Sequence, residues 1–138
     1  MRLTFINNEN VDDQGQLEMA RASRLVEYQR LNGKYLKEAE ELLEKNDFPQ
    51  ASEKLWGAAV EMIKALAMKR GITLGTHRSL AVFLIRLNDE HPELDLIRGF
   101  DAAEGLHINF YEDYLPEQIV RIRAAVVKDF VEKLRRLL

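Results

Sequence analysis

The chain has 138 residues, of which 46% are hydrophobic and 31% are charged, a composition that suits one globular domain with a substantial core. It contains no cysteine, which excludes disulfide frameworks, thiolate metal sites and cysteine nucleophiles. The formal net charge of −3 argues against a nucleic-acid footprint over the whole surface, while leaving room for a local basic patch. No signal-peptide pattern opens the chain and no apolar run reaches the ~18 residues of a membrane span, so we expect a cytoplasmic protein with no membrane partner.

The first part of the sequence predicts a polar N-terminal segment followed by a long helix. Residues 1–15 are expected to form a flexible N-terminal segment, and residues 16–138 a single helical-bundle domain. A helical pattern runs from about residue 16 to residue 45, with Asn32-Gly33 expected to kink or split it. One face of this helix carries the row Leu17, Ala20, Arg24, Tyr28 and Leu31.

The stretch 48–66 predicts the central helix of the fold. Its apolar residues cover more than half of the helix circumference, so the helix needs neighbours on several sides. Pro49 suits the first turn, and Gly71 suits the stop. Gly57 lies in the middle, where it predicts close approach of a second backbone.

Three further helices are predicted at 79–90, at 94–114 and from Pro116 onward. Each has one row that we expect to be buried: Leu80, Phe83, Leu84 and Leu87 in the first; Phe100, Ala103, His107, Phe110, Tyr111 and Tyr114 in the second; and Ile119, Ile122, Val126, Phe130, Leu134 and Leu137 in the third. Short connections favour antiparallel neighbours, so the sequence predicts an all-α, up-and-down bundle of four or five helices.

His107 is the most informative single residue because it lies in an apolar row. One interpretation is a core histidine bonded to Glu104 or to a tyrosine. The other is a ligand-binding histidine, with Trp56 and Tyr111 walling a small pocket beside Glu104 and His107. Glu104 and His107 also have the Glu-x-x-His spacing of di-iron bundles, but no second such motif exists, so neither a metal nor another cofactor is expected.

Three segments resemble the archaeal PaREP family, which is placed among HEPN-like helical bundles. They are QASEKLWGAA at 50–59 with IKA at 63–65, THRSL at 76–80, and HINFYE at 107–112. The resemblance covers roughly residues 35–138 and implies a four- or five-helix bundle that pairs into homodimers. Trp56, Gly57, His107, Asn109, Tyr111 and Glu112 match residues that recur in the family.

Many HEPN proteins are ribonucleases built on an arginine followed, after four to six residues, by a histidine. Here eight residues separate Arg98 from His107, and about 100° of rotation per residue places the two on opposite helix faces. They cannot converge on one phosphate if the helix is continuous. By the same angular count, Asn109 and Glu112 point away from His107, which makes them candidates for a second surface.

The sequence therefore predicts a non-catalytic HEPN-like module that self-associates and binds a partner, with nucleotide or RNA as the candidate ligand. The homodimer contact is expected at Leu17, Ala20, Tyr28 and Leu31, together with Asn109 and Glu112. Two alternatives stay open: a divergent HEPN-type ribonuclease that uses His107, and a purely structural protein–protein adaptor.

Overall fold

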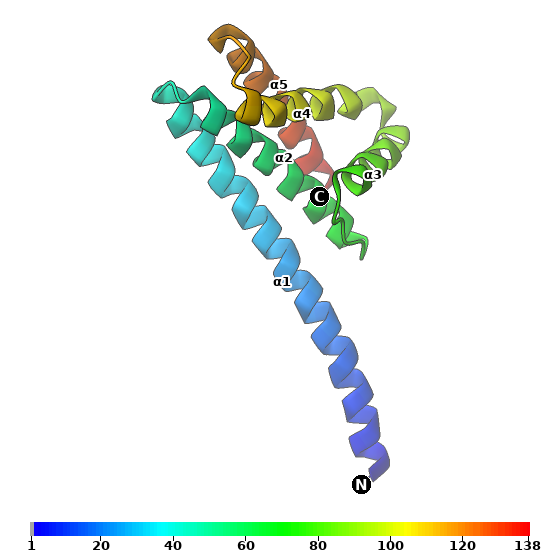
Figure 1. Cartoon of the computed structure of the whole chain (residues 1–138). Coiled ribbons are helices and arrows are strands. Elements are labelled where there is room, and N and C mark those ends of the chain that lie inside the picture. Colours follow the sequence, from blue (N-terminus) through cyan, green and yellow to red (C-terminus); the bar gives the residue numbers. More distant parts are fainter. Residues whose placement is uncertain (1) are drawn as a thin grey trace.

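The computed structural model describes the backbone of residues 2–138 and the side chains from Asp12 onward. Over this range it is all-helical, as predicted: α1 (Arg2–Glu44), α2 (Phe48–Lys69), α3 (His77–Glu90), the short 3-10 helix η1 (Pro92–Leu94), α4 (Leu96–Glu112) and α5 (Glu117–Leu137) (Figure 1). The flexible segment predicted at 1–15 falls mostly outside the described side chains. The division of the chain at residue 15 therefore stays a prediction.

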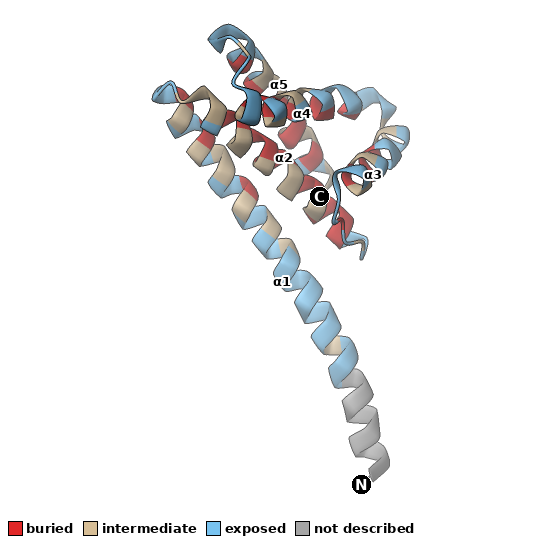
Figure 2. Ribbon diagram, viewed as in Figure 1, coloured by how far each residue is buried: buried red, intermediate tan, exposed pale blue. Residues whose placement is uncertain are grey.

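Helix α2 is the centre of the fold, and α1, α3, α4 and α5 all pack against it (Figure 1). Asp47 caps its first turn by accepting a hydrogen bond from the Gln50 backbone N–H at 3.3 Å, and Pro49 follows. After its last turn Gly71 adopts φ +74°, a conformation that glycine takes without strain. Twelve side chains of α2 are buried, which confirms the predicted central helix (Figure 2).

Helix α1 is continuous through Asn32-Gly33, so the predicted kink or split is wrong. Asn32 is buried and forms hydrogen bonds to other helices. Its Nδ2 donates to the Ala58 carbonyl of α2 at 2.7 Å. Its Oδ1 accepts from Arg135 of α5 at 3.0 Å. The asparagine therefore joins three helices instead of breaking one.

Gly57 makes room for a ring, not for a backbone. A Cβ at this position would lie 3.1 Å from the Tyr35 ring of α1. The expected close backbone approach is therefore corrected to a close approach of a side chain.

Helix α3 has the buried face that was predicted: Leu80, Phe83, Leu84 and Leu87. It begins at His77, two residues earlier than expected, because Thr76 and Ser79 form a capping box. Thr76 Oγ1 accepts from the Ser79 N–H, and Ser79 Oγ accepts from the Thr76 N–H, both at 3.0 Å. This cap places His77 in the first turn, at the end of the helix that approaches α2.

The buried faces of α4 and α5 differ from the predicted rows. The side chains that α4 buries are Leu96, Gly99, Phe100, Ala103, Leu106 and Asn109, and those that α5 buries are Val120, Ala124, Val127, Phe130, Val131 and Leu134. Tyr111, Tyr114, Ile119 and Ile122, all expected inside, are exposed, while His107 and Phe110 are half-buried. Both helices carry two adjacent apolar rows, and the row that is buried has the smaller residues, among them Gly99, whose missing Cβ leaves room for the Phe130 ring.

Candidate ligand-binding site

His107 is held by a carboxylate from another helix. Its Nδ1 lies 3.0 Å from Oε2 and 3.2 Å from Oε1 of Glu53 on α2, and its side chain is 21% exposed. With the proton on Nδ1, this N–H donates to Glu53 and leaves Nε2 as an acceptor; when both nitrogens are protonated, Nε2 becomes a second donor. The expected partner Glu104 is wrong, because Glu104 is exposed and lines a different cavity, with Gly105 and Arg123.

Three helices bring four rings together, and we call Trp56, His77, His107 and Tyr111 the His107 cluster. Trp56 stacks on His107, with ring centroids 4.9 Å apart and an interplanar angle of 23°. The His77 ring lies nearly perpendicular to both, with ring centroids 5.5 Å from Trp56 and 5.2 Å from His107. Tyr111 meets His107 edge-on at 5.4 Å. Trp56, His107 and Tyr111 thus lie close together, as predicted, and His77 joins them without having been predicted.

The exposure of the rings in the cluster increases from the core towards solvent. Trp56 is 5% exposed, as expected of a residue between α2 and α4, and it also contacts Phe100 at 5.9 Å. Tyr111, at the other end, is 73% exposed, and His77 is exposed as well. A rigid buried ring thus supports polar rings that reach water, an arrangement on which a planar ligand can stack.

Sequence reasoning missed Glu53 and His77. Glu53 is 54 residues from His107 and lies in the narrow polar arc of α2, where a solvated charge is the ordinary expectation. His77 lies at a helix boundary. Its only available signal was the Thr76–Ser79 spacing, because a capping box at this point predicts that His77 is the first helical residue.

The predicted subunit-contact residues fall into three groups. Leu17 and Ala20 are exposed on α1, whereas Tyr28 is half-buried against the core and Leu31 is half-buried. Glu112 is exposed at the end of α4.

Asn109 is the exception, since it is fully buried within its own chain. Its Nδ2 donates to Ser52 Oγ at 3.1 Å, and its Oδ1 accepts from the N–H groups of Tyr114 and Leu115 at 3.0 and 2.9 Å. It closes the turn after α4 and is removed from the candidate subunit contacts. The angular count placed it opposite His107, which is correct, but that side faces the core.

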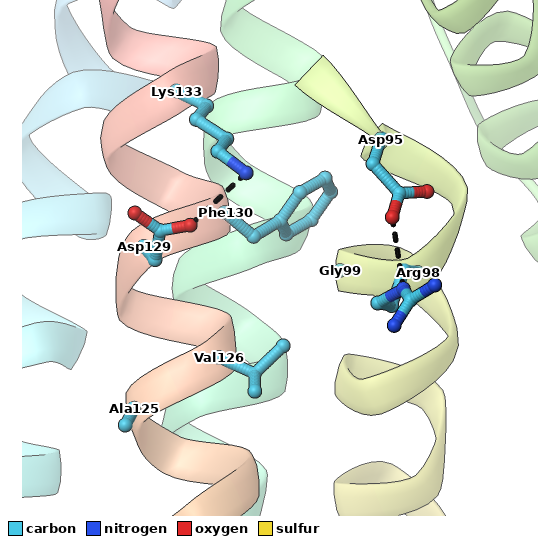
Figure 3. A pocket seen from close by; sticks show the side chains of 8 residues that line it. All are labelled: Asp95, Arg98, Gly99, Ala125, Val126, Asp129, Phe130 and Lys133. Atoms are coloured by element: carbon cyan, nitrogen blue, oxygen red, sulfur yellow. Dashed lines mark ion pairs between the residues drawn. The ribbon is translucent and has the colours of Figure 1, made fainter. Parts of the chain in front are cut away.

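Arg98 lies far around α4 from His107. It lines a cavity of about 360 Å³ between α4 and α5, is 81% exposed, and pairs with Asp95 at 2.8 Å (Figure 3). Across the same cavity Lys133 pairs with Asp129 at 3.1 Å and donates to the Leu94 carbonyl at 3.1 Å. These charges face their own partners, so this cavity offers a ligand less than the His107 cluster does.

Among the side chains described from residue 12 onward, no group of three or more His, Asp or Glu is arranged to hold a metal ion. Within the described part of the chain, no helix is both long and apolar enough to cross a membrane.

The comparisons place the chain in a family. A comparison with curated proteins finds no match. The crystal structure of a protein from Sulfolobus solfataricus is similar, with 26% sequence identity and a TM-score of 0.69 over 77% of this chain and 94% of that chain. The model of the archaeal PaREP1/PaREP8 family matches residues 27–131, a range that includes the whole His107 cluster and Glu53. The chain therefore belongs to the archaeal PaREP1/PaREP8 family.

Proposed function

We propose that this protein is a non-catalytic, HEPN-like helical module that self-associates and binds a nucleotide or an RNA base on the His107 cluster. The observation that carries the proposal is the convergence of four rings from three helices on the Glu53–His107 pair, with Tyr111 73% exposed. Exposed aromatic rings are the common platform for unpaired bases, and stacking contributes about 1–3 kcal/mol per base.

The polar groups around the rings suit the rest of such a ligand. Beside the stacking surface, Nε2 of His107 can accept or donate a hydrogen bond, depending on its protonation. The Glu53 carboxylate is a further acceptor. The first turn of α3 begins at His77, and a helix N-terminus favours a phosphate group there. Arg78, exposed in the same turn, adds a cation.

Fluorescence tests this proposal directly, because Trp56 is the only tryptophan in the chain and lies within the cluster. Titration with nucleoside monophosphates and with short single-stranded RNA should change its emission. Tyr111→Ala should weaken binding about tenfold, the equivalent of roughly 1.4 kcal/mol.

The matched control is Tyr114→Ala, which removes another exposed tyrosine at the same end of the molecule and should leave the affinity unchanged. Equal affinities of the wild type and Tyr111→Ala would contradict base stacking at this cluster.

Self-association is proposed through the first half of α1. This helix runs past the end of α2, where Arg21 lies beside Gly71 (Figure 1). From Asp12 to Arg24 every residue except Gly15 is exposed, and Leu17 and Met19 are 44% and 71% exposed (Figure 2). An isolated helix is marginal in water, so pairing with a second copy would stabilise it.

Light scattering on full-length protein and on a variant lacking residues 1–20 tests this contact. We expect a dimer for the former and a monomer for the latter. The truncation spares Tyr28 and Asn32, which pack against the bundle. A dimeric truncation would move the contact elsewhere, and Glu112→Arg on α4 would then test the other predicted residue.

The ribonuclease alternative is favoured by one observation: Glu53 orients His107 so that Nε2 is available for proton transfer, with His77 at 5.2 Å. Against it, Arg98 pairs with Asp95 on the α5 side of α4. We expect purified protein not to cleave single-stranded RNA. Robust cleavage that disappears in His107→Ala would establish the enzyme. A dimer that binds neither nucleotide nor RNA would favour the structural adaptor.

A further inference from the structure

A second cavity adjoins the His107 cluster on its α1 side. It has a volume of about 330 Å³ and lies between α1 and α2, with Tyr35, Trp56 and Val60 as apolar walls. Gly57 forms part of the wall as well. Since a Cβ there would lie 3.1 Å from the Tyr35 ring, the glycine lets this ring take its position beside the cavity.

The carboxylate of Glu61 lines this cavity, and no described side chain forms an ion pair with it. Its Oε2 is buried and accepts no hydrogen bond from any described residue. Burial raises the pKa of Glu61, and the negative charge of Glu27 on α1 adds to that rise, while nearby Lys64 acts in the opposite direction. A carboxylate in this position gains most from a ligand that brings a positive charge and N–H donors.

The cavity's own cation is engaged elsewhere. Lys54 Nζ lies 2.7 Å from Glu38 Oε2 and 5.0 Å from the centroid of the Tyr35 ring. Glu53, the other acidic residue of the lining, pairs with His107. Among the described residues, none is therefore hydrogen-bonded to the Glu61 carboxylate, and the position of Lys54 illustrates that the Tyr35 ring accepts an ammonium group on its face.

We propose that this cavity binds a small organic cation, with its ammonium group on the Glu61 carboxylate and its alkyl part against Tyr35, Val60 and Trp56. A carboxylate flanked by aromatic rings is the usual chemistry for ammonium recognition. A site of this size holds a compact amine. Trp56 and Glu53 border both sites, but the inference rests on Glu61, Tyr35 and Val60, none of which the nucleotide proposal uses.

The experiment titrates full-length protein with n-butylammonium chloride and follows both Trp56 emission and binding heat. Saturable binding is expected with n-butylammonium, and none at the same concentrations with neutral 1-pentanol or with potassium chloride. Glu61→Gln, which keeps the shape of the side chain and removes its charge, should weaken binding at least tenfold. Glu104→Gln, an exposed glutamate on α4, is the matched control and should bind as the wild type does.

Three results would overturn the proposal: binding of 1-pentanol as strong as that of the amine, equal binding by potassium chloride, or unchanged affinity in Glu61→Gln with a native circular dichroism spectrum. Tyr111→Ala separates this proposal from the nucleotide proposal. It should weaken nucleotide binding about tenfold and leave n-butylammonium binding intact, so either site can fail without the other.

Discussion

Each of the two faces of α4 carries a basic residue that pairs with a carboxylate, but the two pairs differ in burial and in their surroundings. On the α2 side, His107 meets Glu53, which is 54 residues away in sequence, and rings from three helices surround the pair. On the α5 side, Arg98 pairs with Asp95, three residues away, and is 81% exposed. A partly buried pair is less screened than an exposed one, and the cluster around it fixes its geometry.

This difference makes the His107 side of α4 the better candidate for a ligand-binding site. The charges on the α5 side satisfy one another within one helix turn, as Lys133 and Asp129 also do. The His107 side combines a rigid base, Trp56, with rings that still reach solvent. A surface already assembled in this way loses less conformational entropy when a ligand binds than one that must first be ordered. The following predictions test the contrast between the two faces.

Trp56→Ala should have the largest effect, a loss of about 3–5 kcal/mol in the free energy of unfolding, because it removes a buried ring that contacts His77, Phe100 and His107. Tyr111→Ala, at the exposed end of the same cluster, should cost less than about 1 kcal/mol. Chemical denaturation measures both. An unchanged midpoint in Trp56→Ala would mean that the rings do not rest on a packed core.

Gly99→Ala should come next, on the α5 side. A Cβ at Gly99 would overlap the ring of Phe130, which is only 2% exposed and has little space to move, so we expect a loss of about 1–3 kcal/mol. Gly105→Ala is the matched control: its Cβ would meet the Nη1 end of the flexible Arg123 side chain.

Because alanine is favoured over glycine in a helix by about 0.5–1 kcal/mol, Gly105→Ala should be neutral or stabilising. Gly99→Ala should therefore unfold at a lower temperature than the wild type, and Gly105→Ala at the same or a higher temperature. Equal destabilisation of the two variants would show that the α4–α5 contact does not relax even where the added Cβ meets only the flexible end of the Arg123 side chain.

The Glu53–His107 pair should show a measurable coupling energy. In a double-mutant cycle of Glu53→Gln and His107→Ala we expect about 0.5–1.5 kcal/mol, since both side chains are less than one-third exposed and the charge-assisted hydrogen bond is partly shielded from water. Unfolding free energies of the two single variants and the double variant give the value. Additive effects would mean that Glu53 does not hold the histidine.

The same cycle for Asp95→Asn and Arg98→Ala should give the smallest effect, about 0–0.5 kcal/mol, because both side chains are more than half exposed. This coupling should also fall as salt is added. A value above that of the Glu53–His107 pair would reverse the comparison and direct attention to the α5 side of α4.

The sequence by itself determined the helices and the burial of the central one. Periodicity predicted the wide apolar arc of α2 and the inner face of α3, since both have one apolar arc and a clear polar remainder. Pro49 and Gly71 predicted the start and stop of α2, because proline and glycine act through local backbone geometry. Trp56, His107 and Tyr111 could likewise be predicted to lie near one another.

Only the tertiary structure decided which of two adjacent apolar rows α4 and α5 bury, because that choice depends on how the two helices fit together, as in the close contact of Gly99 with the Phe130 ring. It also decided the fate of three polar residues. Asn109 looked like a surface residue, Glu53 like a solvated charge, and Asn32 like a helix breaker, yet each has its hydrogen-bond partner on another helix. Local patterns carry no information on such partners, since these pairs join segments 26 to 103 residues apart that meet only when the bundle closes.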